Sequence, residues 1–189
     1  DRELLTRLFS EFEFSSLLQQ IKTNAAKPVK DCSVITDGAK LSELVVRLQE
    51  SAEIACEIIR EKNAPQELIG ITLSIGGNSF YLPLGHTNAK EQLEAEAALV
   101  ALAPVFANAG IKKYIYDLKT ALVTLANFEV HTGFDLQLAA YLLNPAKPSY
   151  ELDEMAWEYL HESVPVPNDV AGGKGKTYPL ALVPVDKMA

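Results

Sequence analysis

Cysteine and histidine are scarce in this sequence, which has two cysteines and three histidines among 189 residues. Two thiols are too few for a disulfide framework or a zinc site, and Cys32 and Cys56 lie in apolar runs that predict buried thiols. The histidines lie far apart and lack the i, i+4 or cysteine-paired spacing of metal ligands. We therefore predict a surface or strand-end position for each of them: His86, His131 and His161.

Positive charge and long hydrophobic runs are also in short supply. The 17 Lys and Arg are outnumbered by 25 Asp and Glu, which gives a formal charge of −8. Proteins bind nucleic acid largely by neutralising phosphates with Lys and Arg, so this balance argues against tight nucleic-acid binding by the chain alone. The most apolar stretch, residues 97–111, contains Pro104 and is too short to span a bilayer. We expect no membrane partner.

The length and the hydrophobic fraction of 48% predict one well-packed α/β domain. Three aspartates, Asp37, Asp117 and Asp135, each precede a helical pattern and are expected to be N-caps. The strand and helix order predicts a mixed sheet, with a hairpin set first and a crossover afterwards. Strands are expected at 32–36, 54–59, 68–75, 80–82 and 113–116, and helices after Asp37 and at 90–107, 118–127, 136–143 and 151–160.

The two ends of the sequence suggest a piece of a longer chain. It opens without methionine and without a signal-peptide layout, and it closes on what reads as the first turn of a helix after Pro184. Leucines and phenylalanines at helical spacing near the start predict an amphipathic segment over residues 1–24, followed by a domain over 29–189.

A glycine- and lysine-rich stretch from Gly172 to Thr177 is superficially similar to a phosphate-binding loop. That loop needs a glycine where Val170 stands, a strand before it and a helix after it. The flanking prolines fit neither element, so we predict an exposed basic loop and reject nucleotide binding.

Carboxylates are the remaining candidates for chemistry. Glu57 lies inside an apolar strand, where an unpaired charge is costly unless it faces water or a partner. It shares a strand face with Ile59 by the period of two, and Asp117 shares a helix face with Ala121. A solvent-facing Glu57 and a helix-capping Asp117 explain the same pattern, and the spacing alone does not decide between the two interpretations.

Several segments resemble, in order, the 3′–5′ exonuclease domain of bacterial family A DNA polymerases. The longest runs from Phe134 to Pro145 and continues from Tyr150 to Ala156. The ordered set covers essentially the whole chain and is specific, although its single motifs are not. The other matching stretches are residues 1–18, 68–72, 81–86, 117–128 and 171–176.

The resemblance implies a ribonuclease H-like fold and a two-metal exonuclease chemistry. In that family an Asp-x-Glu pair on the first long strand and an Asp on a later helix hold the metal ions. Those positions here are Glu57, Ile59 and Ala121, with Asp117 standing at the asparagine that precedes the helix carboxylate. Ile and Ala cannot bind Mg²⁺, and one Glu with a distant Asp does not supply its octahedral oxygen ligands.

We therefore expect a non-catalytic, structural exonuclease-like domain of a proofreading-deficient polymerase, with no catalytic residue, metal or cofactor in this chain. The resemblance implies a polymerase domain as partner. That domain would contact the DNA, hold Mg²⁺ and carry synthesis for replication and repair in a bacterial cytoplasm. Two alternatives stay open. One is an active nuclease that uses Glu57, Asp117 and Asp135 as relocated ligands, and the other is a free-standing ribonuclease H-like binding module.

Overall fold

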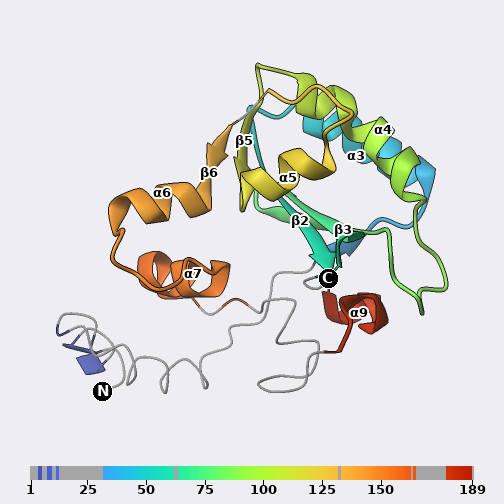
Figure 1. The fold of residues 1–189 in the computed structure, drawn as a ribbon. Coiled ribbons are helices and arrows are strands. Elements are labelled where there is room, and N and C mark those ends of the chain that lie inside the picture. The colour runs from blue at the N-terminus through green and yellow to red at the C-terminus, as the bar shows by residue number, and fades with distance from the viewer. Residues whose placement is uncertain are drawn as a thin grey trace.

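A computed structural model describes residues 4–5, 8–9, 12, 32–61, 64–131, 133–162, 164 and 178–188. In these ranges a six-stranded mixed sheet carries helices on its faces and beyond one edge (Figure 1). The predicted segment 1–24 falls almost wholly outside the described residues, although Leu4, Leu5, Leu8 and Phe9 are helical where they are described. The basic loop from Gly172 to Thr177 lies outside them as well.

The strands pair in the order β1-β4-β3-β2-β5-β6. The antiparallel β2–β3 and β3–β4 pairs form the hairpin set. The remaining pairs are parallel: β1 joins β4, β5 joins β2, and β6 joins β5. This mixed arrangement confirms the predicted fold class. The strand bounds are β1 Cys32–Val34, β2 Glu53–Glu61, β3 Ala64–Ile75, β4 Asn78–Pro83, β5 Lys112–Ile115 and β6 Phe134–Asp135.

Helices α3 and α4 lie side by side over one face of the sheet (Figure 1). Their leucines and the sheet isoleucines form the main core. Helix α5 follows β5, while α6 and α7 lie beyond the β6 edge (Figure 1). The helix bounds are α3 Gly38–Gln49, α4 Ala95–Ala107, α5 Leu118–Thr124, α6 Leu136–Leu143, α7 Leu152–Leu160, the 3₁₀ turn η1 Leu180–Leu182 and α9 Val185–Met188.

Local capping chemistry fixes several of these boundaries. The three predicted caps are confirmed, because Asp37, Asp117 and Asp135 each accept hydrogen bonds from backbone N–H groups in the first turn of their helix. The Gly76-Gly77 turn has φ of +54° and +80°, which suits a two-residue hairpin loop of the primed type. Composition and turn chemistry therefore determine these local structures.

Some boundaries differ from the predicted ones. The helix predicted over 90–107 begins only at Ala95, because the Glu94 carboxylate caps it by accepting from the N–H groups of Glu96 and Ala97 at 3.0 and 2.6 Å. Helix α7 starts at Leu152, one residue later than predicted, and its N-cap Glu151 makes no side-chain capping bond. The two-residue strand β6 was not predicted at all.

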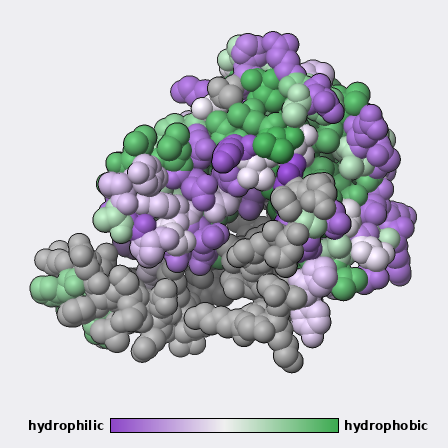
Figure 2. Space-filling view, viewed as in Figure 1, coloured by the Kyte–Doolittle hydropathy of each residue, from purple (hydrophilic) through white to green (hydrophobic). Residues whose placement is uncertain are grey.

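Large apolar side chains also reach the surface. In Figure 2 they gather over α5 and α6, and exposed members include Val123, Leu138 and Leu142. A shallow apolar groove runs between α6 and α7 and is lined by Phe134, Leu143, Met155 and Leu160, among others. No helix of the described residues is both long and apolar enough to cross a membrane.

Candidate functional site

Strand β2 lies inside the sheet, and its side chains point alternately to two faces that have different surroundings. Ile54, Cys56 and Ile58 point into the main core. The alternate residues Glu57 and Ile59 face the opposite side, as the period of two predicts. This second face is where the resemblance places the first pair of metal-binding carboxylates.

Ile59 is buried in a small apolar cluster of its own. The side chain is 5% exposed and packs with Ile69, Tyr81, Leu180 and Val183. Leu180 and Val183 come from η1 and the residue that follows it, residues 180–183, which we call the C-terminal turn. This turn lies more than a hundred positions after Ile59 in the sequence. The turn therefore covers the strand position at which the family pattern expects a carboxylate.

Ala121 occupies the helix position of the pattern and is also buried. It is 1% exposed and belongs to the main core, together with Ile58 and Leu125. Helix α5 packs against β2, and Asp117 caps that helix from a left-handed backbone conformation with φ +51°. A methyl group in a closed core offers no oxygen to a metal ion.

Glu57 is half-buried in the middle of β2 and is not a strand-end residue in open solvent. Burial raises the pKa of its carboxyl group. Burial likewise raises the pKa of the nearby Tyr116 hydroxyl, and the negative charges of Glu151, Glu57 and Asp117 raise it further. The Tyr116 hydroxyl donates to Glu151 Oε2 at 3.3 Å. The Tyr116 hydroxyl therefore contacts one carboxylate, that of Glu151, and is influenced by the charges of Glu57 and Asp117.

The positive group in this region is the Arg60 guanidinium. Burial lowers its pKa, and the attraction of the Asp117 carboxylate opposes that shift. Asp135, the third relocated candidate, is engaged as the N-cap of α6 and accepts from Gln137 and Leu138 N–H groups at 2.9 and 3.0 Å.

The described residues do not fit the metal ions that the family pattern implies. Among them no three His, Cys, Asp or Glu side chains come together as a set able to hold a metal ion. Mg²⁺ needs several oxygen ligands in a tight octahedron. Glu57, Asp117 and Asp135 therefore do not form a metal site in this arrangement.

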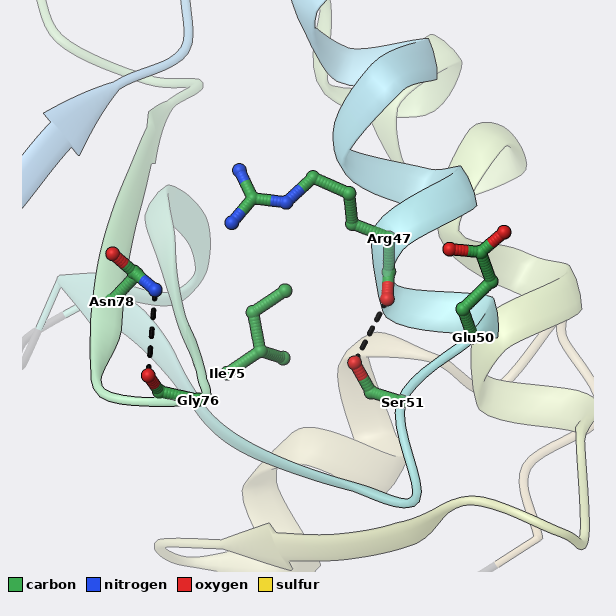
Figure 3. A pocket seen from close by; sticks show the side chains of 6 residues that line it. All are labelled: Arg47, Glu50, Ser51, Ile75, Gly76 and Asn78. Atoms are coloured by element: carbon green, nitrogen blue, oxygen red, sulfur yellow. Dashed lines mark hydrogen bonds between the residues drawn. The ribbon is translucent and has the colours of Figure 1, made fainter.

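A polar groove elsewhere on the domain was not predicted from the sequence. It lies between the C-terminal end of α3 and the β3–β4 turn, where Arg47, Glu50 and Ser51 face Ile75, Gly76 and Asn78 (Figure 3). The Arg47 guanidinium also lies 5.0 Å from the centre of the Phe80 ring. One cation beside one carboxylate at an open surface defines no ligand chemistry.

A surface position for His86 is ruled out, because this side chain is 3% exposed. Its Nε2 lies 2.6 Å from the Tyr81 hydroxyl and its Nδ1 lies 2.8 Å from the carbonyl oxygen of Val183. The sequence signal for its burial was weak: His86 lies three residues after the end of the apolar strand β4. His131 and His161 are exposed, as predicted.

Comparison with known proteins places these observations in a family. Residues 54–181 match the model of the DNA polymerase I, ribonuclease H-like domain. The chain is 28% identical over 167 residues to DNA polymerase I of Chloroflexus aurantiacus and 27% identical over 180 residues to that of Bacillus caldotenax. These alignments cover 83% and 93% of this chain but only 17% and 19% of those relatives. The chain thus spans less than a fifth of their length.

Solved structures with low sequence identity share the fold. Trypanosoma brucei RNase D in complex with GMP matches with a TM-score of 0.63 and 12% identity, covering 82% of this chain and 51% of that one. The POL domain of Pol1 from M. smegmatis, solved with a DNA primer-template and dNTP, matches with a TM-score of 0.55 and 22% identity over 70% of this chain and 23% of that one. The family model covers more than half of the sequence, and the chain belongs to the family of the DNA polymerase I, ribonuclease H-like domain.

Proposed function

We propose that this chain is a non-catalytic, structural exonuclease-like domain of a proofreading-deficient family A DNA polymerase. The proposal rests on the burial of Ile59 and Ala121. At these two positions the family pattern expects a carboxylate and this sequence has none. Each side chain packs in an apolar cluster that leaves no oxygen ligand at its position.

The apolar replacements have a simple physical rationale. Two metal ions in an exonuclease site neutralise clustered carboxylates, activate water and stabilise the leaving oxygen. Without those ions, clustered carboxylates would repel one another in a poorly solvated cleft. Isoleucine and alanine remove that repulsion and allow the surfaces to pack. The cleft thereby becomes part of the core.

The relatives supply the setting for this domain. They are named DNA polymerase I, and the matched part makes up only 17% and 19% of their length. We propose that a polymerase domain is the partner of this one, that it makes the principal DNA contacts, and that it holds the Mg²⁺ for synthesis. The net charge of −8 supports a domain that does not hold DNA by itself.

A nuclease assay on the full-length protein tests this proposal. Single-stranded DNA labelled at its 5′ end is incubated with Mg²⁺ or Mn²⁺ in the absence of nucleotides, and we expect no shortening from the 3′ end. Metal-dependent shortening would contradict the proposal. If shortening were lost in a Glu57→Gln variant, the active-nuclease alternative with relocated ligands would replace it.

A further inference from the structure

Hydrogen bonds as well as apolar contacts attach the C-terminal turn to the sheet. Leu180 and Val183 are 4% and 5% exposed and pack on Ile59 and Ile69. In addition, the backbone N–H of Thr87 donates to the carbonyl of Ala181 at 2.8 Å. The His86 side chain completes this attachment through the carbonyl of Val183.

The hydrogen bond to the Val183 carbonyl defines the tautomer that the neutral His86 imidazole adopts. A carbonyl oxygen only accepts, so the Nδ1 that faces Val183 at 2.8 Å carries a hydrogen. In the neutral imidazole Nε2 then has the lone pair, and the Tyr81 hydroxyl donates to it at 2.6 Å. Gly70 makes room for the Tyr81 ring, because a Cβ at that position would lie 2.5 Å from the Tyr81 hydroxyl oxygen.

Protonation would disrupt this arrangement. A proton on Nε2 turns that atom into a donor, so the Tyr81 hydroxyl hydrogen loses its acceptor inside a closed cluster. The new positive charge would be buried, because Tyr81 is 0% and His86 3% exposed. An unpaired buried charge is costly, and opening of the turn gives it access to water.

The groups around His86 offer little compensation for such a charge. The Gln92 side chain accepts from the backbone N–H of His86 but carries no charge, and the Glu61 carboxylate is engaged by the N–H of Leu180 at 2.6 Å. The thiol of Cys32 is partly buried, and burial raises its pKa. Other titratable groups on the packed elements include Glu57 and Arg60 on β2 and the exposed side chains of Glu67 on β3 and of Asp186 and Lys187 on α9.

We propose that His86 is a pH-sensitive latch: the neutral imidazole holds the Leu180–Val183 turn on the sheet, and protonation releases it. This inference goes beyond the proposed function and does not depend on it, since it rests on the contacts of the turn alone. It also extends to α9, because Val185 and Met188 pack on the same small cluster.

The direction of the pH dependence follows from the burial of the imidazole. Burial lowers the pKa of His86, although the hydrogen bond to the Val183 carbonyl acts in the opposite sense. The released turn exposes the side chain, whose pKa then returns to about 6.5. The closed turn is therefore fully stable above that value and loses stability as the pH falls toward the lowered pKa. Each unit of lowering corresponds to a tenfold change in the opening equilibrium.

Amide hydrogen exchange on the 189-residue chain tests the latch. The reporters are the N–H groups of Thr87, Leu182 and Val183, which donate to Ala181, Pro179 and Leu180 carbonyls. After correction for intrinsic rates, we expect their protection to fall roughly tenfold or more between pH 7.5 and 5.0. The protection of Ile71 in the central sheet should stay constant. Unchanged protection of the turn would overturn the proposal.

Two matched measurements assign any such fall to His86. A His86→Asn side chain can still donate to Val183 but does not titrate, so turn protection should become independent of pH, whereas the exposed His131→Asn control should behave as the parent chain. Nitrogen NMR of the parent chain should show the tautomer with hydrogen on Nδ1, and its titration midpoint should coincide with the loss of protection. A pH-dependent fall in turn protection that persists in His86→Asn would contradict the latch. So would a His86 titration midpoint that differs from the pH at which protection is lost.

Discussion

The two faces of strand β2 bury apolar side chains in different ways. On one face Ile54, Cys56 and Ile58 enter a large core that two long helices cover. On the other face Ile59 enters a cluster of only five buried residues, covered by a C-terminal turn that His86 and Glu61 help to hold. The first face is the scaffold of a ribonuclease H-like fold. The second is the face on which the family pattern places catalytic carboxylates.

The contrast between the two faces explains how the fold can be stable whether or not carboxylates occupy the second face. The scaffold face depends on many leucines and isoleucines that all support one another. The second face depends on few contacts, most of them distant along the chain. With the apolar Ile59 on this face the sheet and its helices are intact, and Leu180 and Val183 of the C-terminal turn pack against the strand.

The largest effect is expected when carboxylates are returned to the second face and the helix position. Ile59→Glu together with Ala121→Asp puts two unpaired acids into sites that are 5% and 1% exposed. We expect the free energy of unfolding to fall by about 3 to 5 kcal/mol at neutral pH, as for uncompensated buried charges. Urea denaturation with circular dichroism measures the change.

A volume-conserving control separates charge from packing in that experiment. Ile59→Leu keeps the cluster apolar and should cost less than about 1.5 kcal/mol. Full stability of the double variant would show that the two positions are open to water, which would undermine the contrast between the faces.

A smaller effect is expected at Glu57, the polar residue that remains on the second face. Burial raises the pKa of this carboxyl above its unfolded value, so the folded state favours the protonated form. The group therefore contributes most to stability below its unfolded pKa, and the contribution is lost as the pH rises through the raised value.

Glu57→Gln isolates this contribution, because glutamine keeps the shape and removes the charge. The free energy of unfolding of the variant should exceed that of the parent chain by up to about 1 kcal/mol at pH 7.5 and by little or nothing at pH 4. Thermal unfolding at the two pH values measures the difference. An equal effect at both would mean that the ionised carboxylate is fully solvated or well paired.

Much of the scaffold could be predicted from local sequence. The side-chain pattern and the aspartate caps correctly predicted where α3, α5 and α6 start. Strand β6 was missed because two residues carry no periodicity, and the start of α4 was misplaced because Glu-rich sequence before Ala95 has a good helical propensity without being helical.

The second face could be predicted only in part. The positions of Glu57, Ile59 and Ala121 came from the family resemblance, but their burial depends on the fold. His86 was misjudged because its partners, Tyr81 and the Val183 carbonyl, are brought to it by the hairpin and by a turn 97 residues away. Residue type and spacing contain no information about such a distant acceptor.

Metal binding tests the central claim most directly, because a two-metal exonuclease cannot work without its ions. Isothermal titration of the 189-residue chain with Mn²⁺ and with Mg²⁺, after removal of trace metal, reports any specific site. We expect no saturable heat for either ion. Stoichiometric binding with a micromolar dissociation constant, lost on Glu57→Gln, would contradict the central claim.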